Sequence, residues 1–117
     1  MIMAGNQSAT PNTQSVLASL ASAADAARQV YLTALAANPG ADLSQLYGAE
    51  MQAAAIWSQA QNKALNNDPS VTAAQANLDA VTKAIRNQLS TMKNISTCVD
   101  LVGNLVQLAA TVAKFIA

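Results

Sequence analysis

Apolar residues recur at helical spacing along most of the chain, and turn signals divide the pattern into three segments. The first segment covers about residues 13–37, and the second covers about residues 42–66. Residues 38–40, with the sequence Asn-Pro-Gly, close the first segment, and residues 66–69, Asn-Asn-Asp-Pro, separate the second from the third. The pattern therefore predicts an all-α protein, with an antiparallel helical hairpin followed by a long third helix.

Local signals at the ends of these segments support the same division. Asp42 is a good N-cap for the second helix, and Gln45 three residues later completes a capping-box pattern. Asp68 can cap the third helix, while Pro69 suits its first position, where a missing N–H loses no partner. Within the first helix, residues 21–27 are almost all alanine and serine, so we expect another helix to approach closely there.

The third segment carries a heptad pattern that continues to the end of the sequence. Its apolar positions alternate between spacings of three and four, with Gln88 at the single polar slot. They are Val71, Ala74, Leu78, Val81, Ile85, Met92, Ile95, Val99, Val102, Val106, Ala109, Ala113 and Ile116. No proline interrupts the segment after residue 69. The pattern predicts one continuous helix of about 46 residues, roughly 70 Å long at 1.5 Å per residue.

A second apolar row joins the first in the last part of this segment. It consists of Cys98, Leu101, Leu105, Leu108, Val112 and Phe115. The polar positions that remain form one line, at Asp100, Asn104, Gln107, Thr111 and Lys114. The first two helices, of about 24 residues each, are long enough to cover only the first half of such a helix. Residues 95–117 would then be apolar around most of their circumference without an intramolecular partner, which soluble monomers rarely show.

This surplus of apolar surface predicts three regions with different roles. Residues 1–12 form a flexible arm, residues 13–94 a helical bundle, and residues 95–117 an apolar helix for assembly. The expected assembly contacts are Val99, Leu101, Val102, Leu105, Val106, Leu108, Val112, Phe115 and Ile116. Tyr47 and Trp57 are expected to anchor the bundle, as aromatic residues on amphipathic helices commonly do.

A bend near residue 95 is the alternative, and it would give a four-helix bundle. In that arrangement Thr97 caps a fourth helix, with Asp100 as its capping-box partner. The heptad phase runs through this point without a slip, and neither glycine nor proline is present there to make a tight turn. These two observations favour the continuous helix, and the four-helix bundle stays open.

Composition changes the picture by removing electrostatic barriers to association. Hydrophobic residues make up 52% of the chain and charged residues only 10%, against about 25% charged in ordinary soluble domains. Six basic and six acidic residues give a formal net charge of zero, so copies of the chain do not repel one another. The basic residues are scattered, which argues against binding of nucleic acid.

The residue types needed for catalysis are largely missing. The chain has no histidine, and its six carboxylates stand alone, with no pair at i, i+3 or i+4 spacing. Cys98 is the only cysteine, and its apolar surroundings favour a buried, unreactive thiol. We therefore expect neither an enzyme nor a cofactor, metal or small-molecule site.

The apolar C-terminal segment also allows a membrane interpretation. Asp100 and Lys114 bracket a short uncharged stretch, about 20 Å long against a hydrocarbon core of about 30 Å, so a lone span is disfavoured. A ring of such helices, with the polar line facing a wet lumen, stays open. The start of the sequence lacks the features of a secretory signal, which predicts a cytoplasmic protein or one exported without a cleaved leader.

Two short stretches resemble subunits of bacterial assemblies. Residues 46–53, with the sequence Leu-Tyr-Gly-Ala-Glu-Met-Gln-Ala, and the glutamines and asparagines that follow resemble the helical segment of R-body proteins, which form intracellular ribbons. Residues 67–69 and 92–95 are instead similar to the turn and the C-terminal stretch of type III secretion needle subunits. The apolar residues after Asn94 continue past the end of a needle subunit, and the first helix is extra. Both resemblances imply a helical homopolymer and single out no functional residues.

The partner of the C-terminal helix decides between the functions that remain. The leading prediction is a non-enzymatic structural subunit that self-assembles through residues 95–117 into a helical oligomer or filament. The alternatives are a membrane-active, pore-forming helical protein and a helical adaptor or chaperone that binds a heterologous partner. All three hypotheses use the same apolar helix, so they differ only in what covers it.

Overall fold

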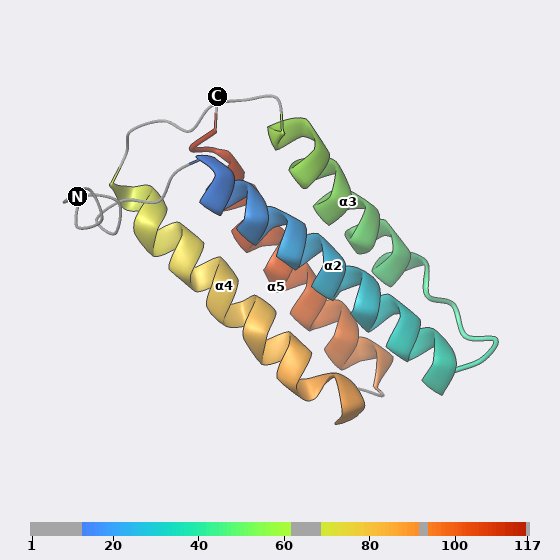
Figure 1. The fold of residues 1–117 in the computed structure, drawn as a ribbon. Helices are drawn as coiled ribbons and strands as arrows, with labels where there is room; N and C mark the ends of the chain where they lie inside the picture. Colours follow the sequence, from blue (N-terminus) through green and yellow to red (C-terminus); the bar gives the residue numbers. More distant parts are fainter. Residues whose placement is uncertain (1–12, 62–68, 92–93, 117) are drawn as a thin grey trace.

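The computed structural model describes residues 13–61, 69–91 and 94–116, and these residues are mostly helical (Figure 1). They form α2 (Thr13–Ala37), α3 (Ser44–Ala60), α4 (Ser70–Gln88) and α5 (Ile95–Ala113), with a short 3-10 turn, η1 (Leu89–Thr91), after α4. The predicted all-α fold is confirmed, in its four-helix form. The predicted arm, residues 1–12, and the cap predicted at Asp68 lie outside the described residues.

Residues 38–40 end α2 as their turn chemistry predicts. The Asn38 N–H donates to the Ala34 carbonyl at 2.9 Å, and the Asn38 side chain donates to the same oxygen at 3.1 Å. Gly40 has a φ of +82°, in the left-handed region that glycine enters without strain. The chain then turns back into α3, so α2 and α3 form the expected antiparallel hairpin (Figure 1).

Asp42 is not the N-cap of α3 that the sequence predicts, because the helix begins at Ser44 and Leu43 takes the cap position without a side-chain cap hydrogen bond. The Asp42 Oδ1 accepts the Ser44 N–H at 3.0 Å. This hydrogen bond holds the pKa of Asp42 below its ordinary value, because it favours the charged carboxylate. α3 ends at Ala60, earlier than the end near Asn66 that the sequence predicts.

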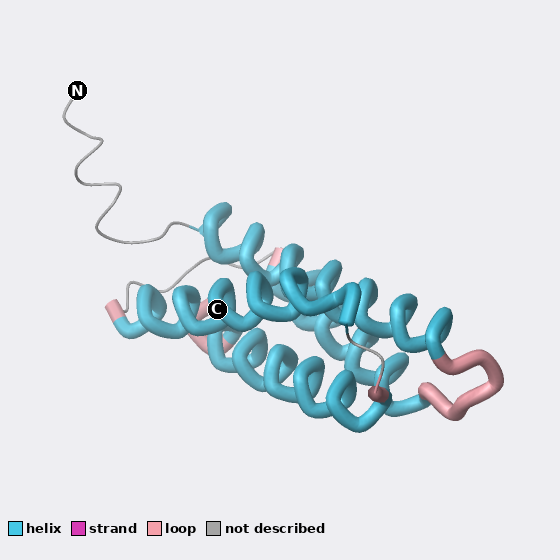
Figure 2. The backbone as a smooth tube through the Cα atoms, turned by 90° about the horizontal axis from the view of Figure 1, so that it is seen from below, coloured by secondary structure: helices cyan, strands magenta, loops and turns pink. Residues whose placement is uncertain are grey.

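The four helices pack as a bundle in which α2 and α5 form the short diagonal. In Figure 1, α2 lies in front, α5 lies behind it, and α3 and α4 flank the pair on opposite sides. α2 and α5 each contact all three other helices, whereas α3 and α4 do not touch each other within the described residues. The view from below shows the helices running along a common direction (Figure 2). α2 and α5 are therefore the central pair of the bundle.

The alanine-rich face of α2 allows this close arrangement. Ala23, Ala26, Ala27 and Ala34 are fully buried. Side chains of a single carbon put little bulk between two helix axes, so neighbouring helices can approach closely. The packing role expected for residues 21–27 agrees with the contacts of α2 to α3, α4 and α5.

The prediction of one continuous third helix is wrong, because the chain turns back between α4 and α5. α4 ends at Gln88, η1 follows, and α5 begins at Ile95. Asn94 caps α5: its backbone is extended, and its Oδ1 accepts the N–H groups of Ser96 at 2.9 Å and Thr97 at 3.3 Å. A 3-10 turn and an asparagine cap need neither glycine nor proline. The bend therefore falls near residue 95, with Asn94 as the cap in place of Thr97.

The buried positions of α5 explain why an unbroken heptad phase did not mean an unbroken helix. The buried side takes alternate members of the two predicted rows: Cys98, Val102, Leu105, Ala109, Val112 and, just past the helix, Ile116. The core seam thus lies between the two rows and keeps every second position of the row that continues the pattern of α4. Two adjacent apolar rows fit both phases, so the sequence pattern did not distinguish them.

The reversal moves residues 95–113 from the end of the molecule into its centre. There the apolar side chains of α5 pack against α2, α3 and α4. Burial of a large aliphatic side chain contributes about 1.5–3 kcal/mol, which favours the folded-back arrangement over an exposed helix. The expectation that this segment lacks an intramolecular partner is therefore wrong for α5.

Replacing Leu105 by alanine should lower the free energy of unfolding by about 2–5 kcal/mol. Leu105 is fully buried in the middle of α5, so the substitution removes packing contacts and leaves a cavity. Chemical denaturation followed by circular dichroism measures the change. Asn104→Ala, at the exposed neighbouring position, should change stability by less than about 0.5 kcal/mol. Equal effects of the two substitutions would contradict the central place of α5.

The Asp42 hydrogen bond predicts a loss of stability in acid. Because the pKa of Asp42 is lower in the folded protein than in the unfolded chain, its carboxylate stabilises the fold above the unfolded pKa. That contribution is lost as the pH falls through the folded pKa, below about pH 4. Asp42→Asn should flatten this part of the stability curve in denaturation experiments at a series of pH values. Asp79→Asn, at an exposed position of α4, is the control. If Asp42→Asn leaves the acid dependence of stability unchanged, the contribution assigned to the Asp42 hydrogen bond is refuted.

Candidate assembly surface

The residues predicted for assembly divide into two groups in the folded bundle. Val102, Leu105 and Val112 are fully buried, and Ile116 is 6% exposed. The others are partly buried and pack against the core: Val99, Leu101, Val106, Leu108 and Phe115. The first group cannot contact another molecule unless the bundle opens, which corrects the predicted interface.

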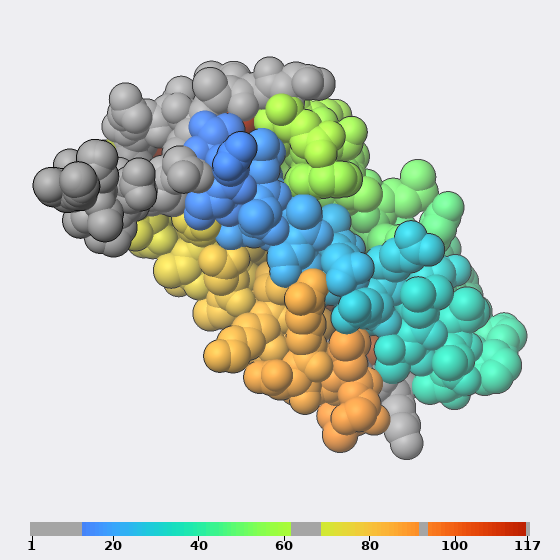
Figure 3. Space-filling view, viewed as in Figure 1, coloured from blue at the N-terminus to red at the C-terminus, as the bar shows by residue number. Residues whose placement is uncertain are grey.

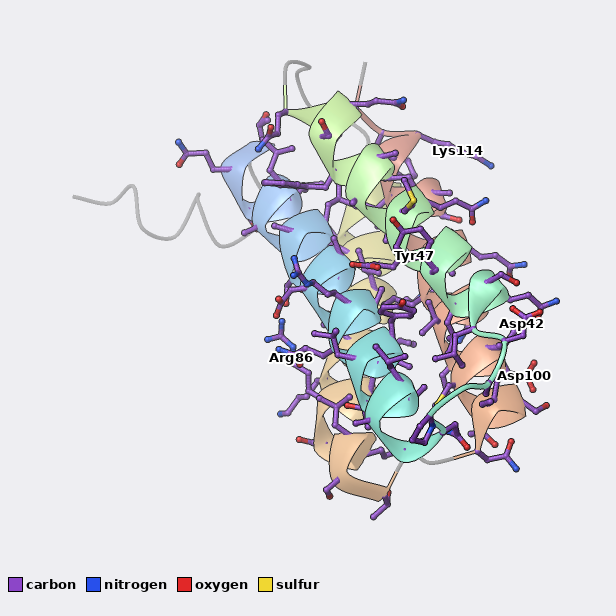
Figure 4. The ribbon with its side chains drawn as sticks, turned by 90° about the vertical axis from the view of Figure 1, so that its right-hand side faces the viewer. Asp42, Tyr47, Arg86, Asp100 and Lys114 are labelled. Carbon is purple, nitrogen blue, oxygen red and sulfur yellow. The ribbon has the colours of Figure 1, made fainter. Side chains whose placement is uncertain are left out.

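The polar line of α5 faces solvent. Asp100, Asn104, Gln107 and Thr111 are exposed, and so is Lys114 after the end of the helix. Asp100 and Lys114 point away from the bundle in Figure 4. α5 therefore has one polar side, one buried apolar side and two apolar flanks that are only partly covered.

The two predicted anchors lie on α3 and are covered to different extents. Trp57 is partly buried and packs against the core. Tyr47 keeps 50% of its surface exposed, and the centre of its ring lies 5.6 Å from that of Tyr31 on α2. Such a tilted ring pair contributes about 0.5–1.5 kcal/mol beyond area burial. Tyr47 therefore joins α3 to α2 at the surface of the bundle and not within its core (Figure 4).

Four large apolar side chains on α2 and α3 are about half exposed. Leu32 is 47% exposed, Leu35 43%, Tyr47 50% and Met51 55%. They occupy the last turns of α2 and the first turns of α3, which lie side by side on the near face in Figure 3. These four residues are the α2–α3 apolar surface.

Sequence reasoning missed this surface, although its signal is present on α2. Successive residues of a helix are about 100° apart around the axis. The buried face of α2 passes through Ala27, Val30 and Ala34. Leu32 and Leu35 fall to the side of that face, so larger apolar residues point outward while alanines point inward.

A shallow groove adjoins the α2–α3 apolar surface. Its volume is about 680 Å³, and the residues that line it are Leu32, Thr33, Ala36 and Ala37 of α2 with Leu89 and Ser90 at η1. None of them carries a charge. Leu32 belongs to both features, so the groove extends the apolar surface toward η1.

Side chains that form hydrogen bonds join α2 to α4. The Gln75 Nε2 donates to the Ser15 Oγ at 2.8 Å and to the Ser19 Oγ at 3.0 Å. Arg86 forms an ion pair with Asp25 at 3.0 Å, and the two side chains are 41% and 55% exposed (Figure 4). A pair this exposed contributes at most about 1 kcal/mol. These groups position α4 on α2 and are engaged within the bundle.

The described part of the chain holds no arrangement suited to metal binding. None of its histidine, cysteine, aspartate and glutamate side chains form a group of three that could hold a metal ion. Every buried side-chain nitrogen or oxygen among the described residues has a hydrogen-bond partner. The exposed large hydrophobic side chains among the described residues are those of the α2–α3 apolar surface.

Comparisons with known proteins give no relative of this chain. No protein-family model matches it, and neither the curated proteins nor the solved structures contain a match. The resemblance to R-body and needle subunits therefore stays a prediction. The fold and the surface define a class of protein: a charge-poor four-helix bundle with an exposed apolar surface on α2 and α3.

Burial of Cys98 predicts a slow reaction with water-soluble thiol reagents. Its side chain is 0% exposed in the bundle, so a reagent reaches the sulfur only when the structure opens. Labelling with an aromatic disulfide reagent, followed by absorbance, should therefore accelerate with added denaturant. Asn104→Cys places a second thiol at an exposed position of the same helix, where it should react at once. Equally fast labelling of Cys98 in the native protein would contradict the packing of α5.

Proposed function

We propose that the protein is a non-enzymatic structural subunit that self-associates into a homo-oligomer or filament. The observation that carries this proposal is the α2–α3 apolar surface, where four large side chains are about half exposed. A single exposed leucine is common in soluble proteins and needs no explanation. Four such side chains, one of which also lines an uncharged groove, are typical of an interaction site.

A second copy of the chain is the partner that this surface suits best. The four residues and the lining of the groove carry no charge, and the whole chain has a net charge of zero. Interfaces between identical subunits are more apolar than other interfaces, at about 65% of their area. Neutral copies also approach one another without long-range repulsion. The contact uses outward side chains and leaves the buried side of α5 inside the bundle.

The geometry of the contact decides how far the assembly grows. A surface that pairs with its own copy closes a two-fold dimer, whereas a surface that pairs with a different one lets a filament extend. The size of the sedimenting species distinguishes the two arrangements. A dimer would indicate pairing of the α2–α3 apolar surface with itself.

Replacing Leu35 and Met51 together by serine should shift the protein toward the monomer. Both side chains are exposed, so the fold should be retained, which circular dichroism checks. Each lost contact removes up to about 1.5–3 kcal/mol, so the association constant should fall at least tenfold. Sedimentation velocity from low to high micromolar concentration, without detergent, measures the change.

Ala76→Ser combined with Ala84→Ser is the matched control. Both positions are exposed on α4, away from the α2–α3 apolar surface, so this variant should sediment as the wild type does. A wild-type protein that stays a monodisperse monomer at high micromolar concentration would refute self-association. An oligomer that persists unchanged in the Leu35 and Met51 variant would refute this surface as its contact.

A further inference from the structure

The turn between α4 and α5 lacks the residues that usually fix a reversal of the chain. Residues 89–94 contain no glycine and no proline. Leu89 keeps helical backbone angles, with φ −54° and ψ −41°, and η1 begins there. Among the described residues of α4, η1, α5 and the turn that joins them, Asn94 is the one outside a helix or 3-10 turn. Asn94 therefore marks the reversal among the described residues.

The Asn94 cap stabilises the reversal and would have no role in a longer helix. Its Oδ1 accepts the N–H groups of Ser96 and Thr97, which lie in the first turn of α5. N–H groups in a first turn have no carbonyl partner within their own helix. If α4 ran on into α5, carbonyls one turn earlier would accept them. The cap therefore favours the turned form, while the local sequence also permits an uninterrupted helix.

The contacts of α5 are what a change of this kind has to replace. α5 packs against α2, α3 and α4, and Val102 and Leu105 on its buried side are fully covered. An α5 that left its own bundle would expose these side chains to water, which is unfavourable. A second copy that has also released its α5 offers the same three helices. Each α5 can then recover its contacts by packing into the other bundle.

We infer that the turn between α4 and α5 is a hinge, through which two copies of the chain exchange α5 and form a domain-swapped dimer. In this dimer α4 and α5 of one chain form one long helix, and α5 fills the core of the partner. The core contacts are the same in both forms, so the forms differ at the hinge and in the freedom lost when two chains join. The exchange does not use the α2–α3 apolar surface, so it does not rest on the proposed function.

A long connecting helix leaves room for both bundles. Leu78 and Leu105 mark the buried sides of α4 and α5, because both are fully buried. They are 27 residues apart in the sequence. In a straight helix with about 100° per residue, they therefore point in directions about 180° apart. The two bundles of the exchanged dimer thus lie on opposite sides of the connecting helix.

Asn94→Ala should favour the exchanged dimer. It removes the cap from the turned form, and alanine is a strong helix former in the long helix. Loss of an N-cap shifts such an equilibrium about fivefold for each chain, so the dimerisation constant should rise about 25-fold. Sedimentation velocity measures the dimer after the protein is unfolded and then refolded at high micromolar concentration. Asn104→Ala makes the same change at an exposed position that is helical in both forms, and it should leave the constant unchanged.

Lengthening the turn should have the opposite effect. Each of three glycines inserted after Thr91 disfavours the long helix about fivefold. Ser90 and Thr91 are exposed, so the turned form can accommodate a longer loop. The dimerisation constant should fall at least 100-fold, while circular dichroism shows that the monomer keeps its helices. The same three glycines inserted after Gly40, between α2 and α3, leave the hinge unchanged and should not alter the dimer.

The distance between α4 and α5 of one chain distinguishes exchange from contact between surfaces. Spin labels on Ala76→Cys and Gln107→Cys occupy exposed positions, and Cys98→Ala leaves them as the only thiols. Both positions are about 13 residues from the turn, so they lie level where α4 and α5 pack side by side. In one long helix they would be about 46 Å apart. Dilution with excess unlabelled chains restricts the measurement to pairs within one chain.

Three results would overturn the inference. They are refolded wild type with no dimer that persists on dilution, a dimer whose labels stay as close as in the monomer, and a dimer unaffected by the glycines after Thr91. A dimer formed through the α2–α3 apolar surface depends on Leu35 and Met51 and dissociates readily on dilution. Exchange reverses slowly, because α5 has to leave a folded core. The inference and the proposed function can therefore fail independently.

Discussion

The contact between α2 and α5, the two helices that each touch all the others, is the constraint on which the bundle depends. Ala23 and Ala27 contribute almost no bulk, while Val102 and Leu105 supply the aliphatic volume on the other helix. Because these two helices contact each other across the bundle, α3 and α4 lie at opposite corners and do not meet within the described residues. Each outer helix then packs into the angle between the central pair. A chain with few aromatic residues can build a core in this way, from small side chains on one helix and branched ones on the other.

The reversal before Asn94 decides what the C-terminal residues do. An unbroken helix would have left two apolar rows outside the bundle. With the turn in place, one side of α5 fills the core, its polar line faces water, and its flanks are partly covered. The apolar surface open to a partner is consequently smaller than the sequence predicts, and part of it lies on α2 and α3. This distribution separates the proposed self-association surface, on α2 and α3, from the apolar helix at the centre of the bundle.

Sequence alone predicts the elements that local chemistry determines. The bounds of α2, Thr13–Ala37, agree with the prediction because Asn38, Pro39 and Gly40 act on the neighbouring residues and need no tertiary partner. The start of α5 was predicted only in the alternative, with Thr97 as the cap, because residues 94–97 offer an asparagine, a serine and a threonine as caps. A heptad pattern also shows which side of a helix is apolar and not which neighbour covers it. Only the folded chain shows that Leu105 packs inside.

The candidate surface was missed for a related reason. Whether Leu32 and Leu35 are exposed depends on which side of α2 faces the core. From the sequence, leucine would ordinarily be expected on the core-facing side in preference to alanine. The close packing of helices reverses that preference, since smaller side chains suit the shortest distance between axes. Tyr47 shows the same effect on α3, where its ring meets Tyr31 at the surface. Exposure of this kind follows from three-dimensional neighbours and leaves only a weak trace in the sequence.

The hydrogen bonds between α4 and α2 have a consequence for the alignment of the bundle. Alanines present nearly the same surface at every turn, so an alanine face alone would let a neighbouring helix slide by one turn, about 5.4 Å, with little change in packing. Gln75 meets Ser15 and Ser19 near one end of the interface, and Arg86 meets Asp25 further along. A shift of one turn would move Arg86 away from Asp25 and would leave Gln75 with at most one of its two serine partners, because Ser15 and Ser19 are themselves one turn apart. These contacts thus fix one alignment among several that a uniform apolar surface would leave nearly equal in energy.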